Sequence, residues 1–505
     1  MVWTVAGSDS GAGAGLQADL RAFDSFGVHG CSVVAAITAQ NSLAVERIEP
    51  VSPDVLDAQL AALASDLPPA AIKTGMLGSA ANLRVVAKWI DRLRERNPAL
   101  PLVVDPVLRS TTGATFADEA LLDAYRRELL PRATLVTPNR GEAAALLGLL
   151  PLQSHNDVEA AAKALREMGC AAVAVTGGDS GGARSEDYVD APYAGGWLSL
   201  PRVDTRHHHG TGCVYASSAA AALALGFVAV EATVLAKMAT THALRRSYAA
   251  GAGAGPVWPG EGFALDTDNL PAFSIPGVGD VPPFAPLSDP ALGLYAIVDS
   301  AAWVRRVIDA GVRTVQLRIK DADAPGLREE IRDAIAASRQ AGAQLFVNDH
   351  WRLAIEEGAY GVHLGQEDLA VADLAAISRA GIRLGISTHA FWEVCRAWAL
   401  KPSYIACGPI HPTRAKAMPW IAQGNGNLAF WCALLPLPVI AIAGMDADRA
   451  TEAMRRGAAG VALISGITAA ASPEAMISTL RQAVENGLET PKYQPPALPQ
   501  STLRP

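Results

Sequence analysis

The second half of the chain repeats one short pattern eight times. Apolar runs alternate with amphipathic segments of helical period, such as LREEIRDAIAASRQAG and DADRATEAMRRGA. The runs are LYAIVD (294–299), TVQLRIK (314–320), QLFVND (344–349), GVHLG (361–365), RLGIS (383–387), YIACGPI (404–410), VIAIAG (439–444) and GVALIS (460–465). Buried parallel strands have continuous apolar sequences, and a helix must cross over between them. Eight such units predict a C-terminal (β/α)8 TIM barrel, with a doubly wound open sheet as the alternative.

A barrel of this kind places its active site at the C-terminal ends of its strands. Polar residues follow the runs there: Gln316, Arg318, Lys320, Asn348, Asp349, His363, Gln366, Asp368, Ser387 and His389. The spacing of Gln316, Arg318 and Lys320 predicts one common face, where the two cations need an anion. Asp349 and Asp368 suit one Mg²⁺ ion that also binds a pyrophosphate, although aspartate is also a common helix N-cap.

The first half of the chain also alternates between apolar runs and helical stretches. The expected strands are VWTVAG, CSVVAAITAQ, AAIKTGM, LVVDPV, TLVTPN and AVAVTGG. The segment YVDAPYAGGWLSLPRV predicts a hairpin that turns around Gly195–Gly196. Together these patterns predict an α/β domain with a mainly parallel sheet and an antiparallel addition.

Proline density divides the chain into two domains. One stretch contains Pro256, Pro259, Pro271, Pro276, Pro282, Pro283, Pro286 and Pro290. Such density prevents a regular helix or a central strand. We therefore expect domains at 1–250 and 291–488, a Pro/Gly-rich linker at 251–290, and a Pro-rich, disordered tail at 489–505.

Composition excludes several classes of protein. Of 505 residues, 50% are hydrophobic and 18% are charged, which is too apolar for a disordered chain. The net charge of −8 argues against a nucleic-acid partner. Six cysteines without a C-x-x-C pair, and a start without signal-peptide features, favour a cytoplasmic protein. The alanine-rich segment 214–230 is interpreted as a buried helix, so no membrane partner is expected, and a homo-oligomer is compatible with the sequence.

The segment HGTGC (209–213) precedes this alanine-rich stretch. Gly210 and Gly212 permit close backbone approach, and the N–H groups of a helix start form an anion site. Cys213 would lie where the helix dipole favours the thiolate. The plainer alternative is a glycine turn that caps a core helix, with Cys213 as a small buried residue.

Oxygen ligands follow two other runs of the first half. Asp105 closes LVVDPV, and TPNRGE places Asn139 and Glu142 three residues apart. Such hard ligands suit Mg²⁺ and its waters, although each residue alone is more often a cap or a surface acid. The segment GSDSGAGAG (7–15) is not a Walker motif, because no G-K-[ST] follows it. The run His207–His209 is a weak metal candidate, since consecutive side chains diverge.

In combination and order, six motifs resemble the hydroxymethylpyrimidine kinase/phosphomethylpyrimidine kinase family, within the ribokinase-like superfamily. They are AGSDSGAGAGLQADL, GCSVVAAITAQNS, KTGML, VVDPV, TPNRGEA and HGTGC, and they span residues 1–250. The resemblance implies a ribokinase-like α/β domain. It also implies transfer of phosphate from ATP to hydroxymethylpyrimidine and then to its monophosphate.

The resemblance implies roles for individual residues. The pyrimidine contacts would be Asp9, Gln40 and Met76. Mg-ATP would be held through water by Asn139 and Glu142, with Asp105 nearby. The anion hole for the moving phosphoryl group would be formed by Gly210 and Gly212, and the base would be Cys213.

One departure from the family concerns ATP. The family carries a lysine where this chain has Thr176, and the loss of a cation near phosphates lowers transition-state stabilisation unless another cation compensates. The first glycine turn also reads GAGAG where the family has SGGAG. The alternatives are therefore a weakened kinase, a pyrimidine-binding module, or a vitamin B6-type kinase.

The motifs QLRIKD, FVNDHWRLAIEEGAYGVHLGQEDL, LGISTH, PTRAK and VALISGIT resemble thiamine-phosphate synthase over residues 291–488. That family joins hydroxymethylpyrimidine diphosphate to thiazole phosphate, giving thiamine phosphate and pyrophosphate. The pyrimidine diphosphate would be bound by Gln316, Leu317, Arg318, Ile319, Lys320, Asn348, Ser387 and Lys416. Mg²⁺ would be bound by Asp349 and Asp368. Thiazole phosphate would be bound by Thr413, Arg414, Ala415, Gly444, Ile464 and Ser465.

Arg318 and Lys416 would also act in catalysis, by assisting the departure of pyrophosphate. Two residues depart from the family: Ala415 replaces a threonine, and Ala443 replaces a glycine. The two resemblances together imply a bifunctional transferase of thiamine biosynthesis that uses Mg²⁺ and ATP on small-molecule substrates. A pair of non-enzymatic binding modules is the remaining alternative.

Overall fold

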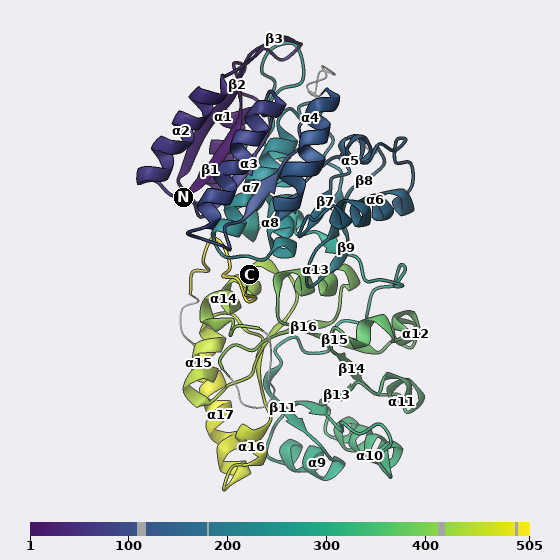
Figure 1. Ribbon diagram of the computed structural model, residues 1–505. Coiled ribbons are helices and arrows are strands. Elements are labelled where there is room, and N and C mark those ends of the chain that lie inside the picture. The colour runs from purple at the N-terminus through teal and green to yellow at the C-terminus, as the bar shows by residue number, and fades with distance from the viewer. Residues whose placement is uncertain (109–117, 179–180, 413–419, 490–492, 505) are drawn as a thin grey trace. The chain divides into compact units, whose positions relative to one another are not determined.

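The computed structural model describes residues 1–108, 118–178, 181–412, 420–489 and 493–504 (Figure 1). Contacts between Cα atoms divide it into two compact units, Met1–Phe273 and Ser274–Arg504. Within this described part, none of the helices combines the length and the apolar character that a membrane span requires.

The described part of the first unit is built on a sheet of ten strands, in the order β10-β9-β8-β7-β6-β5-β4-β1-β2-β3. The strands are β1 (Val2–Asp9), β2 (Gly30–Gln40), β3 (Val45–Pro50), β4 (Ala71–Thr74), β5 (Leu102–Val104), β6 (Leu135–Val136), β7 (Val173–Val175), β8 (Arg184–Asp190), β9 (Gly195–Pro201) and β10 (Ala272–Phe273). The strands from β2 to β7 pair in parallel, and antiparallel strands extend the sheet at both ends. The predicted α/β class is therefore confirmed.

Helices pack against this sheet in two groups. The longer ones are α1 (Gly15–Ser25), α2 (Pro53–Asp66), α3 (Ala80–Arg94), α4 (Glu119–Ala124), α5 (Arg140–Leu147), α6 (His155–Glu167), α7 (Thr211–Ala224) and α8 (Ala229–Arg245). Short turns are η1 (Tyr125–Leu129), η2 (Leu130–Arg132), η3 (Phe263–Leu265) and η4 (Thr267–Asn269). Helices α1, α7 and α8 share one apolar cluster, and α2 to α6 share another. The segment 214–230 does not form the single buried helix that is expected from its sequence, because it contains the buried part of α7, a turn with the exposed Leu225, and the start of α8.

The hairpin turns at a different place from the one predicted. Strands β8 and β9 are joined by residues 191–194, because Asp190 already pairs with Gly195. Pro192 cannot donate a hydrogen bond to the ladder, and Tyr193 adopts a φ of 77°. The turn therefore forms at the proline, and the glycine pair predicted to turn lies within β9.

The second unit is a closed barrel of eight parallel strands in its described residues, in the order β11 to β18. They are β11 (Gly293–Val298), β12 (Thr314–Leu317), β13 (Gln344–Asn348), β14 (Gly361–Leu364), β15 (Arg383–Thr388), β16 (Tyr404–Cys407), β17 (Val439–Ile442) and β18 (Gly460–Leu463). Each overlaps one of the predicted runs, and only β11 and β15 extend one residue beyond theirs. Strand β18 pairs with β11, which excludes the open sheet and confirms the barrel.

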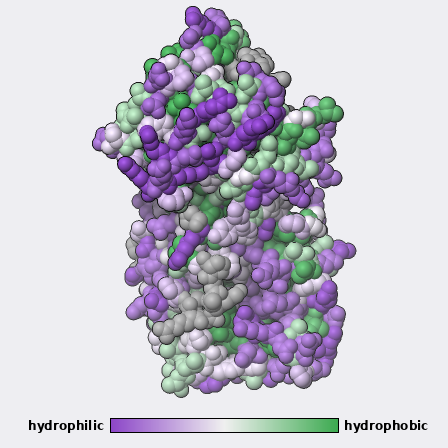
Figure 2. Space-filling model, in the orientation of Figure 1, coloured by the Kyte–Doolittle hydropathy of each residue, from purple (hydrophilic) through white to green (hydrophobic). Residues whose placement is uncertain are grey.

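Amphipathic helices connect the barrel strands. They are α9 (Ala301–Asp309), α10 (Leu327–Gln340), α11 (Trp351–Glu356), α12 (Leu374–Arg379), α13 (Phe391–Leu400), α14 (Gly424–Leu434), α15 (Ala447–Arg455), α16 (Ser465–Thr468) and α17 (Pro473–Leu488), with the turn η5 (Asp368–Ala370). On the face shown in Figure 2, hydrophilic side chains predominate and hydrophobic residues form separate small patches. The helices thus turn their polar sides to solvent, as their sequence period predicts.

The proline-rich segment 251–290 is divided between the two units. Its first part packs on the first unit, where Gly253 donates to Ser42 and β10 pairs with β9. Its last part packs on the barrel, where the Pro286 carbonyl accepts from the Arg383 side chain. Prolines prevent helix formation, but their carbonyls still accept hydrogen bonds. The domain limits from the sequence stay a prediction.

The end of the tail is packed, contrary to the disorder expected from its composition. Gln500 exchanges backbone hydrogen bonds with the Asn427 side chain, and Ile421 donates to the Thr502 carbonyl. Leu503 is only 2% exposed. The prolines preset an extended backbone, so packing a few residues costs less conformational entropy than the composition suggests.

Candidate active sites

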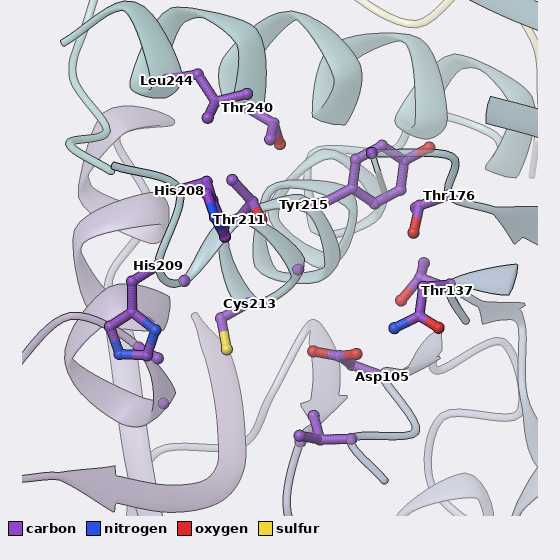
Figure 3. A pocket seen from close by; sticks show the side chains of 18 of the residues that line it. Asp105, Thr137, Thr176, His208, His209, Thr211, Cys213, Tyr215, Thr240 and Leu244 are labelled. Carbon is purple, nitrogen blue, oxygen red and sulfur yellow. The ribbon is translucent and has the colours of Figure 1, made fainter. Parts of the chain in front are cut away.

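A cavity of about 940 Å³ lies in the first unit (Figure 3). Its lining includes all the residues that the sequence singled out there: Asp9, Gln40, Met76, Asp105, Asn139, Glu142, Gly210, Gly212 and Cys213, together with Thr176. They come from the ends of the parallel strands and from the start of α7. The carboxyl ends of parallel strands meet at one edge of a sheet, which is where α/β proteins bind ligands.

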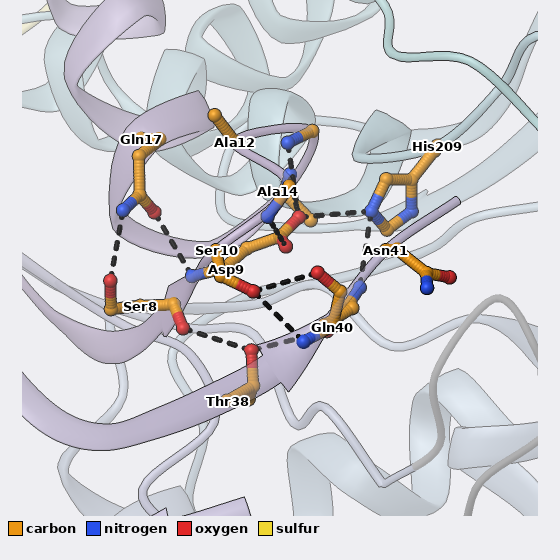
Figure 4. Close-up of polar contacts among 12 residues, drawn as sticks. Ser8, Asp9, Ser10, Ala12, Ala14, Gln17, Thr38, Gln40, Asn41 and His209 are labelled. Atoms are coloured by element: carbon orange, nitrogen blue, oxygen red, sulfur yellow. Dashed lines mark hydrogen bonds and ion pairs between the residues drawn. The ribbon is translucent and has the colours of Figure 1, made fainter. Parts of the chain in front are cut away.

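Asp9 organises the glycine-rich turn at one side of the cavity (Figure 4). Its carboxylate accepts hydrogen bonds from the backbone N–H groups of Gly11, Gly13 and Ala14. The Nε2 atom of His209 lies 3.1 Å from Asp9 Oδ2. Burial alone would raise the pKa of Asp9, but His209 and the backbone donors lower it below the ordinary value. Asp9 is therefore an ionised anchor of the turn.

His209 connects this turn to the segment before α7. The same Nε2 atom lies 3.3 Å from Gln40 Nε2. The His209 ring therefore contacts both Asp9 and Gln40, two predicted pyrimidine contacts, and it directly precedes Gly210 of the predicted anion site. The backbone of His209 is held by Gly255 and Val257, which belong to the proline-rich segment. In the sequence, His209 belongs to the HGTGC motif and to a weak metal candidate, but nothing local to it indicates these distant partners.

The two glycines before Cys213 differ in what the fold requires of them. Gly210 has a φ of 86°, and a Cβ there would lie 2.1 Å from the carbonyl oxygen of Gly13. This position needs glycine for both conformation and space. A Cβ on Gly212 would meet no described atom within 4 Å, so this position does not need glycine for space, and its N–H belongs to the first turn of α7, whose N–H groups have no partner within the helix.

Cys213 is the third residue of α7 and faces Asp105 across the cavity (Figure 3). The expected thiolate is wrong for this structure, because burial raises the pKa of Cys213 to about 12. Lys73 favours the thiolate, whereas the carboxylates of Asp19 and Asp105 oppose it. Desolvation thus outweighs the helix dipole that the sequence argument relied on.

A buried lysine beneath the cavity is the main feature that sequence reasoning missed. Lys73 on β4 is 0% exposed and donates to Asp19 at 2.9 and 3.0 Å. Asp19 also accepts from Thr4 and Ser217, which satisfies both of its oxygens. Burial disfavours the ammonium, but Asp19 and nearby acids raise the pKa of Lys73 above its ordinary value. The available signal was a lone lysine inside the apolar strand AAIKTGM.

Asp105 lies on the other side of Lys73, with 3.7 Å between its Oδ2 atom and the Lys73 ammonium. No described atom forms a hydrogen bond with this buried Oδ2. Burial raises the pKa of Asp105 to about 6, while Lys73 opposes the shift and Asp19 adds to it. The cavity thus contains a carboxylate whose proton affinity is set near neutral pH.

Asn139 and Glu142 form a capping box at the start of α5. The Asn139 side chain accepts from the Glu142 N–H, and the Glu142 side chain accepts from the Asn139 N–H, both at 2.9 Å. This is the capping alternative that the sequence left open. Both residues also line the cavity, so capping fixes their position without excluding a ligand.

Thr176 lies beside Asn139, and a second buried ion pair lies close by. The Lys237 ammonium on α8 is 2.9 Å from Asp187 Oδ2 and donates to Ser185. Asp187 also accepts from the N–H of Gly177, directly after Thr176. Lys237 lines the cavity at only 4% exposure. The fold therefore brings a cation near Thr176 that the sequence did not identify.

The barrel residues that were assigned to Mg²⁺ lie together at the mouth. Asp349 follows β13 with a φ of 62°, a strained conformation for a residue other than glycine. Asp368 begins η5, and its Oδ2 accepts from the Gly365 N–H. Burial and the neighbouring Asp368 carboxylate raise the pKa of Asp349, and Arg318 opposes the shift. Two carboxylates that repel one another in this way form a suitable donor set for a divalent cation.

The pyrimidine diphosphate residues differ in how they face the mouth. Gln316 points into the barrel, where it donates to the Tyr295 hydroxyl. Leu317 is buried on the opposite side of the strand, so its side chain does not reach the interior. Strand β12 ends at Leu317. The common face predicted for Gln316, Arg318 and Lys320 therefore does not continue along a strand, and Lys320 is exposed. Arg318 is half-buried.

The remaining assigned residues follow other strands of the barrel. Ile319, Asn348, Ser387, Gly444, Ile464 and Ser465 all lie at or just beyond strand ends. Ser387 accepts or donates a hydrogen bond at 2.8 Å from His363, a residue to which no role was assigned. Thr413, Arg414, Ala415 and Lys416 lie outside the described residues. Among described residues, no group of three or more His, Cys, Asp or Glu side chains forms a ready metal cluster.

Family comparisons separate the chain in the same way as the fold. Residues 9–258 match the family model of phosphomethylpyrimidine kinase, and residues 294–467 match that of thiamine monophosphate synthase. A solved complex of Bacillus subtilis pyridoxal kinase with ADP is 32% identical, with a TM-score of 0.48, and covers 51% of this chain and 96% of its own. Fold and family models together define a two-domain transferase, a kinase followed by a synthase barrel.

Full-length relatives have both domains in one chain. The chloroplastic thiamine biosynthetic bifunctional enzyme of Arabidopsis thaliana is 36% identical over 483 residues, which is 92% of this chain and 89% of the relative. The thiamine-phosphate synthase of Photorhabdus laumondii is 52% identical over 189 residues, 37% of this chain and 87% of its own. The chain belongs to the family of thiamine biosynthetic bifunctional enzymes.

Proposed function

We propose that the first unit phosphorylates hydroxymethylpyrimidine and then its monophosphate with ATP, and that the barrel joins the diphosphate to thiazole phosphate. The observation that carries the proposal is the single cavity lined by every kinase residue taken from the sequence. The nine residues come from separate strand ends and from the start of α7, and they line one concave site with several convergent polar groups, as a ligand pocket does.

For the kinase, the N–H groups at the start of α7, around Gly210 and Gly212, would hold the moving phosphoryl group. In place of Cys213, the base implied by the resemblance, we propose Asp105, because a pKa of about 6 leaves it ionised at neutral pH. The substrate oxygen forms a bond to the γ-phosphorus as the bond to ADP breaks, and its proton passes to Asp105. Asn139 and Glu142 would hold Mg-ATP through water, and Asp9, Gln40 and Met76 would contact the pyrimidine.

Lys237 is the cation that we propose in place of the lysine missing at Thr176. It lies in the same part of the cavity, and its partner Asp187 is fixed by the Gly177 N–H. A bound triphosphate would compete with Asp187 for the ammonium. This arrangement supports an active kinase over a module that only binds the pyrimidine.

For the barrel, Asp349 and Asp368 fit a Mg²⁺ ion, which would neutralise the diphosphate and weaken its bond to carbon. Arg318 and Ser387 would hold the diphosphate, together with Lys416. The carbon–oxygen bond breaks with its electrons leaving on pyrophosphate, and the thiazole nitrogen then forms the new bond to that carbon. No protein nucleophile is needed, so the protein positions and neutralises charge.

The test is turnover by the whole chain. Hydroxymethylpyrimidine, Mg-ATP and thiazole phosphate should give thiamine phosphate, pyrophosphate and ADP, followed by chromatography. Supplying hydroxymethylpyrimidine phosphate and the diphosphate separately tests each step alone. Pyridoxal in the same panel tests the vitamin B6-type alternative: phosphorylation of pyridoxal in preference to the pyrimidine would replace the proposed first substrate. The cytoplasmic location stays a prediction. The absence of nucleic-acid and membrane partners also stays a prediction.

A further inference from the structure

A chain of hydrogen bonds crosses the inside of the barrel below its mouth. Gln316 contacts the Tyr295 hydroxyl at 3.3 Å, and that hydroxyl contacts the Tyr404 hydroxyl at 2.8 Å. The Tyr404 hydroxyl lies 2.7 Å from Nδ1 of His363, whose Nε2 lies 2.8 Å from the Ser387 hydroxyl. Each of the five residues comes from a different strand.

The chain is enclosed by the fold. Tyr295 and Tyr404 are 1% and 0% exposed, and Gln316 and His363 are buried. Gly385 makes room for it, since a Cβ there would lie 2.1 Å from the Tyr404 ring. Only Ser387, at the end of β15, is partly exposed. The chain therefore begins in the core and ends at the mouth of the barrel.

His363 is uncharged in this setting. His363 is only 6% exposed, and its two ring nitrogens contact the Tyr404 and Ser387 hydroxyls rather than a carboxylate, so no opposite charge offsets the cost of a buried imidazolium. A neutral imidazole has one N–H and one acceptor nitrogen, and a tyrosine or serine hydroxyl has one hydrogen to donate. Each interior member of the chain can therefore donate to only one neighbour.

This inventory allows only two arrangements. All hydrogens point toward Ser387, or all point toward Gln316 with its amide oxygen accepting, because any mixture places either two hydrogens or none between two neighbours of the chain. In the first arrangement His363 carries its hydrogen on Nε2 and donates to Ser387, whose own hydrogen stays free. In the second, Ser387 must donate to His363, and its hydroxyl can then only accept from a ligand.

An anion can only accept hydrogen bonds, so only the first arrangement lets Ser387 bind a diphosphate. We propose that the chain from Gln316 to Ser387 is polarised toward the barrel mouth, and that it directs the Ser387 hydroxyl hydrogen at the pyrophosphate oxygens of the substrate. The identity of the ligand rests on the proposed synthase function, whereas the direction of the hydrogen-bond chain does not. His363 and Tyr404 are thus positioning residues, which act through Ser387.

The direction can be measured without turnover. Nitrogen-15 spectra of the full chain labelled at histidine distinguish a protonated ring nitrogen from an unprotonated one, and loss of one signal in His363→Asn assigns it. We expect a hydrogen on Nε2 and none on Nδ1. A hydrogen on Nδ1 would overturn the proposal, because the chain would then run toward the core.

The consequence for binding is tested with inorganic pyrophosphate and Mg²⁺ by calorimetry. Ser387→Ala should weaken binding about tenfold or more, since a hydrogen bond to a charged group is lost. Tyr404→Phe should weaken it roughly threefold to tenfold and give mixed His363 tautomers, because Nδ1 loses its donor. The matched control is Tyr360→Phe, whose hydroxyl contacts Ser288 and Gln344 outside this chain, and which should bind as the unaltered protein does.

The outcomes separate the two layers of the argument. Unchanged pyrophosphate binding in Ser387→Ala would remove Ser387 from the diphosphate site, and with it the proposed ligand, whatever the tautomer. Alternatively, Ser387→Ala could bind pyrophosphate more weakly while Tyr404→Phe changes neither the binding nor the His363 tautomer. That result would leave the synthase function intact and overturn the polarised chain.

Discussion

The two candidate sites handle buried charge in opposite ways. Under the kinase cavity, each buried lysine has an opposite charge within 2.9 Å: Lys73 pairs with Asp19, and Lys237 with Asp187. Inside the barrel, the chain from Gln316 to Ser387 consists of neutral groups, and burial keeps His363 uncharged. Buried charges are costly unless paired, so both solutions satisfy the same physical requirement.

The difference follows from where charge is needed. Beneath the kinase cavity, the Lys73 ammonium is in place before any ligand binds. It lies beside Asp105, a carboxylate with a pKa of about 6. At the barrel mouth, Asp349 and Asp368 repel one another, and a metal ion and a diphosphate would balance them. The kinase site is preorganised by ion pairs, whereas the barrel site is preorganised by dipoles and completed by its ligands.

The largest expected effect comes from breaking an ion pair under the kinase. Lys73→Met keeps the bulk but leaves Asp19 and Asp105 without their cation. We expect a loss of about 3–5 kcal/mol in the unfolding free energy of the first unit. Denaturant unfolding followed by Trp fluorescence measures it. The exposed Lys88→Met is the control, and equal stability of both variants would refute the role of Lys73.

The comparison also predicts that the barrel should not respond to that change. Asp349→Asn should instead lower thiamine phosphate formation about 10²–10³-fold, because it removes one of the carboxylates that would hold the metal ion. Pyrimidine phosphorylation by the same variant should be unchanged. The control is Asp323→Asn, which changes an exposed acid in the segment that follows strand β12. Thiamine phosphate formation at the normal rate in Asp349→Asn would remove the proposed Mg²⁺ role.

The kinase activity should fall as the pH decreases below neutrality. Asp105, with its pKa of about 6, binds a proton as the pH falls, so kcat/KM of the kinase should fall about tenfold per pH unit below 6. The folded state binds this proton more tightly than the unfolded chain, so the first unit should gain stability over the same range. In Asp105→Asn the acid limb should disappear along with most activity. A kinase profile that is flat from pH 5 to 7 would assign the proton acceptor elsewhere.

Much of the architecture followed from local patterns. The eight barrel strands matched eight apolar runs because each βα unit is a short-range feature with its own period. The hairpin turn was misplaced because two residue types with turn preference, Pro192 and the pair Gly195–Gly196, competed within five residues. The ordered tail was missed because its partner Asn427 is distant in sequence.

The sites were predictable only as far as motifs reach. Strand ends brought Asp9, Asp105 and Asn139 together, as the motifs implied. Lys73 and Lys237 were missed because a buried ion pair joins segments far apart in the chain, so the position of Lys73 in an apolar strand did not reveal its partner. The Cys213 thiolate was expected from the helix dipole, and no local pattern reports the desolvation that outweighs it.

The smallest expected effect tests a feature that the two sites share. Ala12 in the glycine-rich turn and Ala443 after β17 have φ values of 59° and 76°, a region that costs a residue with a Cβ about 1–2 kcal/mol. Ala12→Gly and Ala443→Gly should each stabilise their unit by roughly 0.5–1 kcal/mol, after the extra entropy of glycine in the unfolded chain is subtracted. Scanning calorimetry should show a rise of about 1–4 °C in the transition of that unit.

The controls for this last pair have the opposite sign. Ala14 and Ala390 have φ values of −138° and −139°, where alanine is unstrained. Ala14→Gly and Ala390→Gly should therefore destabilise their units by about 0.5–1 kcal/mol. If glycine lowered the transition temperature at 12 and 443 as it does at 14 and 390, the left-handed alanines would not be strained. If glycine stabilises the units at positions 12 and 443 but destabilises them at 14 and 390, each site keeps a small backbone strain at its loop, although the two sites balance charge differently.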